Sequence, residues 1–149
     1  MKIILASDHA GFELKNKILA YLKSESFDVE DMGAHVYEPV DDYPKIMIPA
    51  AMRVISDEQN TIAIILGKSG NGEAMISNRF PGVRAAVYHG KNLDIVRLAR
   101  EHNNANILSL AAGFLDESEA IEAVRLFIVT PFSGDPRHVK RNEMLDNIQ

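Results

Sequence analysis

Seven consecutive residues in the middle of the chain, Gly67 to Glu73, are the segment best suited to chemistry. They read Gly-Lys-Ser-Gly-Asn-Gly-Glu, and the three glycines leave backbone N–H groups free to face an anion. The carboxylate of Glu73 can accept a carbon-bound proton while loop amides stabilise the developing enediolate oxygen. The loop matches neither a Walker loop nor the G-x-G-x-x-G pattern. A strand-to-helix turn that binds nothing, with Glu73 as an ordinary first-turn acid, is an equal alternative for this segment alone.

Titratable side chains also occur at two other points beside short apolar runs. Asp8 and His9 follow the first run, where Asp8 is equally suited to cap a helix. His102 and Asn103 precede the last run. A hydrogen-bonded histidine near a helix end would explain that second pair without any function. Function at either point therefore depends on which residues the fold brings together.

Two arginines near the C-terminus lie four positions apart, which puts Arg137 and Arg141 on one face of a helix. Both guanidinium groups can then clasp one phosphate, although a solvated charged surface is the more ordinary explanation of such a pair. The five histidines show no spacing typical of metal ligands, and the chain has no cysteine. We therefore expect no metal and no other cofactor.

The elements that must position these residues follow from the hydrophobic pattern. Short apolar runs, which predict buried strands, alternate with helical spacings of apolar residues. The predicted strands are residues 2–6, 27–32, 61–66, 83–87 and 105–110, of which 27–32 is weaker and edge-like; the predicted helices cover 14–22, 45–56 and 120–128. In the helix at 45–56, Pro49 is tolerated only in the first turn. The pattern predicts an α/β fold, a three-layer sandwich with a five-stranded parallel sheet.

The C-terminal stretch predicts an additional short helix from Pro136 to Gln149, with Asp135 as its cap. Its few apolar residues could pack on a neighbour; they are Val139, Met144, Leu145 and Ile148. A helix this short is marginal alone, so it must dock on its own domain or on a partner subunit. In open α/β sheets ligands bind beyond the carboxyl ends of the strands, so we expect the polar loops after the strands to form the site.

Composition limits the class of protein. A chain of 149 residues, 46% hydrophobic and 25% charged, fits one globular domain over 1–149. A net charge of −5 does not favour nucleic-acid binding, which needs a basic face. No run reaches the about 18 apolar residues of a membrane span, and the first apolar run is too short for a signal peptide. We expect a cytoplasmic protein that binds neither nucleic acid nor membrane.

Taken in order, these motifs resemble the ribose-5-phosphate isomerase B family, which also includes galactose-6-phosphate isomerase subunits. The resemblance runs through nearly the whole chain and is carried by residues 7–11, 42–44, 67–73, 77–86, 100–106 and 137–141. It implies a Rossmann-like fold and a metal-free aldose–ketose isomerase that acts on a sugar phosphate, with ribose 5-phosphate as the leading substrate. It also implies a homodimer or a dimer of dimers with sites at the subunit interface. One branch of the family has Cys at the position of Gly67 as its base; this chain resembles the other branch, which uses a glutamate.

The resemblance implies a role for each matching residue. Glu73 would move the proton between C1 and C2, and His102 would protonate the ring oxygen during ring opening. The substrate-binding residues would be Ser69, Gly70, Asn71 and Gly72 for the sugar oxygens and the enediolate, Asp8 and Asn103 for the sugar, and His9, Arg137 and Arg141 for the phosphate.

Two positions depart from the family. Gly113 stands where the family usually has an arginine that contributes to phosphate binding, and Lys68 stands where glycine is common. Either another cation such as Lys68 compensates, or the preferred substrate is another sugar phosphate, such as a tetrulose or hexose 6-phosphate. A non-catalytic phosphosugar-binding subunit is the alternative from a different class, against which the retained Glu73 and His102 argue.

Overall fold

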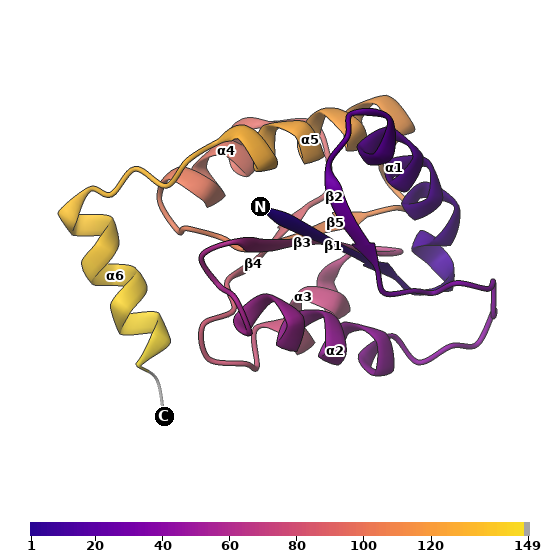
Figure 1. Cartoon of the computed structure of the whole chain (residues 1–149), viewed down its shortest axis with the longest axis horizontal. Helices are drawn as coiled ribbons and strands as arrows, with labels where there is room; N and C mark the ends of the chain where they lie inside the picture. The colour runs from indigo at the N-terminus through magenta and orange to yellow at the C-terminus, as the bar shows by residue number, and fades with distance from the viewer. Residues whose placement is uncertain (148–149) are drawn as a thin grey trace.

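The computed structural model, which describes residues 1–147, is built on one five-stranded parallel sheet in the order β2-β1-β3-β5-β4 (Figure 1). Every neighbouring pair of strands is parallel. The strands are β1 (Lys2–Ser7), β2 (Asp28–Asp31), β3 (Thr61–Gly67), β4 (Ala85–Tyr88) and β5 (Ile107–Ala111). The five predicted strands are confirmed, and β2 lies at an edge of the sheet as its weak apolar pattern indicated.

Helices cover both faces of the sheet, which gives three layers (Figure 1). One core layer joins the sheet to α1, α4 and α5, and the other joins it mainly to α2. The helices are a one-turn 3-10 segment (His9–Gly11), α1 (Phe12–Ser24), α2 (Tyr43–Ile55), α3 (Asn71–Ser77), α4 (Asp94–Glu101), α5 (Glu117–Val129) and α6 (Pro136–Asp146). Among residues 1–147, no helix has the length and apolar character needed to cross a membrane.

Burial on both faces explains why the central strands are continuous apolar runs. In β1, Ile3 and Leu5 pack into one core while Ile4 and Ala6 pack into the other. Successive side chains of a strand point to opposite faces, so a strand covered on both sides has no polar positions to alternate with.

The position of Pro49 differs from the predicted one. Helix α2 begins at Tyr43, before the predicted start at residue 45, so Pro49 lies in the helix interior and not in its first turn. Proline has no N–H to donate to the carbonyl four residues earlier, which weakens the helix at this point. The helix continues because one whole face of it, comprising Met47, Ala50, Ala51 and Val54, is fully buried against the sheet.

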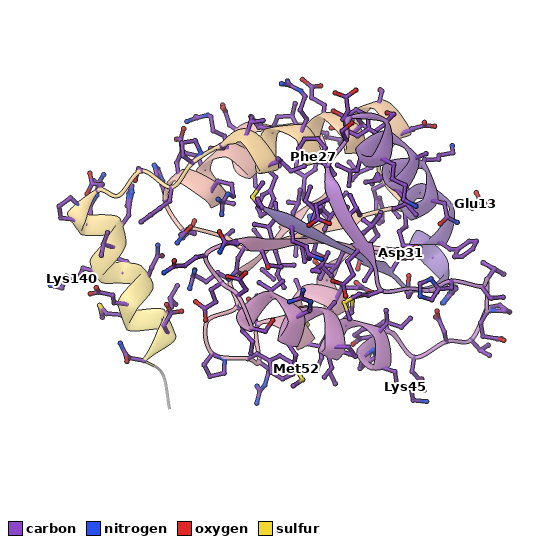
Figure 2. The ribbon with its side chains drawn as sticks, viewed as in Figure 1. Glu13, Phe27, Asp31, Lys45, Met52 and Lys140 are labelled. Carbon is purple, nitrogen blue, oxygen red and sulfur yellow. The ribbon has the colours of Figure 1, made fainter. Side chains whose placement is uncertain are left out.

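Helix α6 stands apart from the sheet and its covering helices (Figures 1 and 2). Its predicted cap is confirmed, because the Asp135 side chain accepts a hydrogen bond from the N–H of Arg137 at 2.8 Å. The helix ends at Asp146, earlier than predicted, and Ile148 and Gln149 lie outside the described residues. The side chains that it buries are polar, namely His138 and Asn142.

Candidate active site

The crevice expected for this fold lies beyond the carboxyl ends of β1 and β3. The chain leaves β1 to form β2 on one side and returns to form β3 on the other, so the two connections diverge between these strands. Asp8 and His9 follow β1, and the segment 68–72 follows β3. The N–H of Asp8 donates to the carbonyl of Leu66 at 3.2 Å, which joins the start of the loop after β1 to the end of β3. Two of the predicted groups of site residues therefore meet here.

Gly70 determines the shape of the loop after β3. Its φ of +74° lies in the left-handed region, where a side chain is strained. Its carbonyl accepts a hydrogen bond from the Ser109 hydroxyl at 2.7 Å, and the Ser69 hydroxyl accepts one from the N–H of Asn71 at 3.3 Å. These contacts hold the turn in which Asn71 and Gly72 start α3 and place Glu73 in its first turn.

Glu73 is buried, with only 4% of its surface exposed. Burial raises the pKa of its carboxyl group, and the negative charge of Asp8 raises it further. The carboxylate occupies the space beside Gly67, where an added Cβ would overlap it. Glycine at position 67 is therefore a steric condition for Glu73 to lie where it does. A buried carboxyl group with a raised pKa is suited to accept and return a proton.

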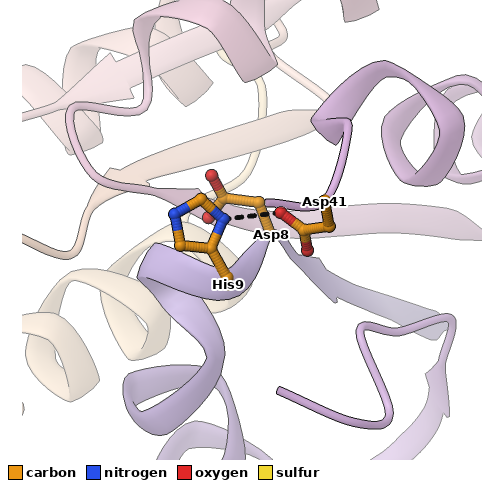
Figure 3. A group of neighbouring side chains, drawn as sticks. All are labelled: Asp8, His9 and Asp41. Atoms are coloured by element: carbon orange, nitrogen blue, oxygen red, sulfur yellow. Dashed lines mark hydrogen bonds and ion pairs between the residues drawn. The ribbon is translucent and has the colours of Figure 1, made fainter. Parts of the chain in front are cut away.

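Asp8, His9 and Asp41 form a compact group at the same edge of the sheet (Figure 3). The predicted capping role of Asp8 is confirmed, since its carboxylate accepts a hydrogen bond from the N–H of Gly11 at 3.0 Å. Burial raises the pKa of Asp8. His9 Nδ1 donates to Asp41 Oδ1 at 2.6 Å. One ligand atom from each of the three residues lies within 4.8 Å of the others, and the hydrogen bond between His9 and Asp41 accounts for their close approach without a metal ion.

The remaining predicted site residues lie at the other end of the strands, on the side of the sheet where the strands begin. His102 is the C-cap residue of α4 and precedes the amino end of β5, whereas Glu73 follows the carboxyl end of β3. A strand advances about 3.3 Å per residue, so roughly 17 Å of β5 separates the two edges. Asn103 is exposed beside His102, and Arg137 and Arg141 are exposed on α6. Within one chain the structure does not bring these four residues to Glu73.

His102 is held at this second edge by α6. Its carbonyl accepts a hydrogen bond from the Asn142 side chain at 3.3 Å, and its ring lies 4.1 Å from the ring of His138, measured between centroids. An open cavity of about 610 Å³ lies beside it, lined by residues that include Asn103, Phe80 and Leu145. We refer to His102, Asn103 and the two arginines of α6, Arg137 and Arg141, as the candidate second half-site.

Three residues beside the loops that follow β1 and β3 were not among the predicted site residues. Asp41 lies 32 positions from His9, so no local spacing could have connected them. Tyr43 packs its ring against Gly72, and it belongs to the motif Asp42–Pro44 that the sequence analysis noted. His89 Nε2 lies 3.2 Å from Asn71 Oδ1. The signal for His89 was its position directly after a strand, which is where this fold gathers ligand-binding residues.

Comparisons with known proteins find relatives that match nearly the whole chain. A ribose-5-phosphate isomerase B from Mycolicibacterium paratuberculosis is 41% identical over 145 residues, which are 97% of this chain and 89% of that protein. One from Mycobacterium tuberculosis is 39% identical and covers 97% of this chain and 88% of its own length.

Solved structures of similar proteins have the same fold. A ribose 5-phosphate isomerase from Thermotoga maritima matches with a TM-score of 0.91 and 40% identity over 99% of this chain and 98% of its own. A ribose-5-phosphate isomerase B from Mycoplasma genitalium with bound ribulose-5-phosphate matches with a TM-score of 0.92 and 34% identity over 97% of this chain and 93% of its own. Residues 3–145 match the model of the family described as Ribose/Galactose Isomerase. The resemblance stated from the sequence is thereby confirmed, and the chain belongs to the Ribose/Galactose Isomerase family.

Proposed function

We propose that the chain is an isomerase that interconverts D-ribose 5-phosphate and D-ribulose 5-phosphate through an enediolate, without a cofactor. The observation that carries the proposal is Glu73, a buried carboxyl group with a raised pKa beside the glycine-rich loop. Relatives that match nearly the whole chain are ribose-5-phosphate isomerases, and the Mycoplasma genitalium protein holds ribulose-5-phosphate.

In this mechanism Glu73 accepts the proton from C2 of the open-chain aldose and returns it to C1, while a hydroxyl proton passes from O2 to O1. C2 is oxidised as C1 is reduced, so no external oxidant is needed. Ser69, Gly70, Asn71 and Gly72 hold the sugar oxygens and the negative charge of the enediolate. The raised pKa of Glu73 supports the return of the proton to C1. A carboxyl group with a higher pKa keeps the proton taken from C2 until it is transferred. Asp8 binds the sugar at the same edge.

The proposal further assigns the second half-site to a partner subunit in a homodimer or a dimer of dimers. His102 would open the sugar ring, Asn103 would bind the sugar, and Arg137 and Arg141 would meet the phosphate together with His9 of the other chain. The support is the separation of the two groups at opposite edges of one sheet. A second copy can present its own half-site to the crevice beyond β1 and β3.

The surface of α6 and the rim of the crevice also support pairing. Helix α6 buries polar side chains but exposes Met144 and Leu145, at 64% and 52%. Val36, Val40 and Phe114, on loops at the carboxyl edge of the sheet, are also exposed, at 75%, 81% and 67%. Other elements also expose apolar side chains, among them Met52, Met75 and Ile95, so these residues support pairing only together with the separation of the two groups of site residues.

The direct test is an assay for ribulose 5-phosphate formation from ribose 5-phosphate, run beside a panel of tetrulose and hexose 6-phosphates. We expect turnover of ribose 5-phosphate. Glu73→Gln should lower kcat by about a thousandfold with substrate affinity largely retained, because the amide keeps the size but cannot accept a proton. A higher kcat/KM for another sugar phosphate would reassign the substrate, and binding without turnover of any would favour a non-catalytic subunit.

The proposal includes a single domain over 1–149 and a cytoplasmic location. Both core layers share the one sheet, which supports the single domain for the described part. Phosphorylated sugars carry charges that a bilayer excludes, so an enzyme that uses them is expected where they are made and consumed.

A further inference from the structure

The contact between His9 and Asp41 has a role that the proposed function does not assign. Asp41 lies on the loop that joins β2 to α2, which begins just after Asp31 at the end of β2 (Figure 2). The same loop lays the ring of Tyr37 edge-on against His9, with centroids 6.4 Å apart. His9 is thus held from one side by a segment distant from it in the sequence.

The environment of Asp41 argues that His9 carries a positive charge. The Asp41 side chain is 12% exposed, and its Oδ2 is buried without a hydrogen-bond partner among residues 1–147. A carboxylate with so little hydration is costly unless a cation lies beside it. The group that lies beside it is His9 Nδ1, at 2.6 Å.

The charge balance of the crevice makes this proton important for an anionic substrate. Asp8, Asp41 and Glu73 bring carboxyl groups to this edge, whereas the loops after β1 and β3 supply His9 and Lys68 as cations. A neutral His9 would leave Lys68 as the cation of these two loops. A charged His9 therefore offsets part of this negative charge where a sugar phosphate approaches the crevice.

We propose that Asp41 is a positioning residue for substrate binding, which holds His9 by Nδ1 as an oriented imidazolium so that Nε2 is left to donate to the phosphate of the substrate. Nε2 takes part in no hydrogen bond with the described residues, and the His9 side chain is one-third exposed, at 33%. This inference rests on the proposed function, because it assigns the phosphate to His9.

The acidic groups around His9 favour the protonated form of its ring. The hydrogen bond to Asp41 raises the pKa of His9 above its usual value, desolvation opposes the rise, and the charges of Asp8 and Asp41 add to it. A raised histidine pKa keeps the ring charged to higher pH and loses that charge as the pH rises through the raised value. Without Asp41, the charge would be lost at lower pH.

The test compares Asp41→Asn with Glu38→Gln, which removes the same charge from an exposed position on the same loop. For ribose 5-phosphate, Asp41→Asn should raise KM about tenfold at about pH 8 and much less at about pH 6, with kcat nearly unchanged. Asp41→Glu should restore part of the effect, and Asp41→Asn should add nothing in a His9→Gln background. Values for Asp41→Asn that match those of Glu38→Gln at both pH values would overturn the proposal.

A second measurement does not depend on catalysis or on the folding of the variant. NMR titration of His9 in the unaltered full chain should give a pKa above the ordinary histidine value and a hydrogen-bonded Nδ1 proton. A His9 pKa at or below the ordinary value would overturn the role of Asp41 even if ribose 5-phosphate is isomerised. Absence of isomerisation together with a raised His9 pKa would instead contradict the proposed function.

Discussion

Gly67 and Glu73 are six positions apart, yet they compete for the same space. A Cβ at position 67 would overlap the Glu73 carboxylate, so the two positions cannot both carry side chains in this arrangement. The family resemblance describes two branches, one with Cys at this point and one with Gly here and Glu at position 73. The overlap supplies a physical reason why a base at one position excludes a base at the other.

Gly67→Ala tests this steric relationship. Gly67 is not among the residues with positive φ, so alanine fits the backbone, and the three nearest atoms that its Cβ would meet all belong to the Glu73 carboxylate. We expect kcat for ribose 5-phosphate to fall about a hundredfold or more, because a displaced base loses its alignment with the substrate carbon. In a Glu73→Gln background the same change should have little further effect. Parental kcat in a folded Gly67→Ala protein would show that Glu73 is not constrained in this way.

Glu73→Gln should also change how stability depends on pH. Burial raises the pKa of Glu73, so the folded protein binds this proton more tightly than the unfolded chain does. The associated stability is present below the ordinary carboxyl pKa and is lost as pH rises through the raised value. The melting temperature of the variant relative to the parent should therefore be higher at about pH 8 than at about pH 4. Calorimetry across this pH range measures both melting temperatures. A difference between variant and parent that does not change with pH would mean that burial does not shift the pKa of Glu73.

At the scale of elements, the loops after β3 and β5 are coupled through Lys68 and Gly113. The N–H of Gly113 donates to the carbonyl of Lys68 at 2.9 Å. A Cβ at position 113 would lie 3.0 Å from both Cγ and the carbonyl oxygen of Lys68. The two departures from the family pattern are therefore neighbours in space, and a side chain at 113 would crowd both the side chain and the backbone carbonyl of Lys68.

This contact predicts how variants at the two positions combine. Lys68→Ala should raise KM for a sugar phosphate about tenfold, whereas Lys23→Ala, which removes an exposed charge on α1, should not. Gly113→Arg alone should not lower KM, because the side chain and the carbonyl oxygen of Lys68 both crowd position 113. Lys68→Ala removes the side-chain contact, so combining it with Gly113→Arg should recover part of the loss. Steady-state kinetics of the four variants test this. A KM for Lys68→Ala equal to that of the parent would remove Lys68 from phosphate binding.

At the scale of the whole molecule, the central prediction is that one site draws on two chains. Glu73→Gln and His102→Ala chains should each be inactive alone. Mixed after dissociation, they should recover about a quarter of the parental activity, since half of randomly paired dimers are hybrids with one intact site of two. Activity is measured after the hybrid is confirmed by mass. A confirmed hybrid without activity would show that Glu73 and His102 do not serve one site in this way.

The sequence by itself determined the sheet and the motifs. Apolar runs predicted all five strands because a strand buried on both faces must be apolar throughout, and Asp135 predicted the start of α6 through a local hydrogen bond. Apolar spacing did not predict α3, because its seven residues make too few turns to show a clear stripe, and it did not predict the eight-residue α4 although that helix is amphipathic. It misplaced Pro49, since burial of one helix face outweighed a missing hydrogen bond.

Only the tertiary structure decided which of the motifs meet. The order of strands places the residues after β1 and β3 together and leaves His102 and the α6 arginines at the far edge of the sheet. The contacts of His9 with Asp41 and of Lys68 with Gly113 join residues on different loops. No local spacing reports such contacts, because they depend on which strands are neighbours and on the space that the surrounding side chains leave.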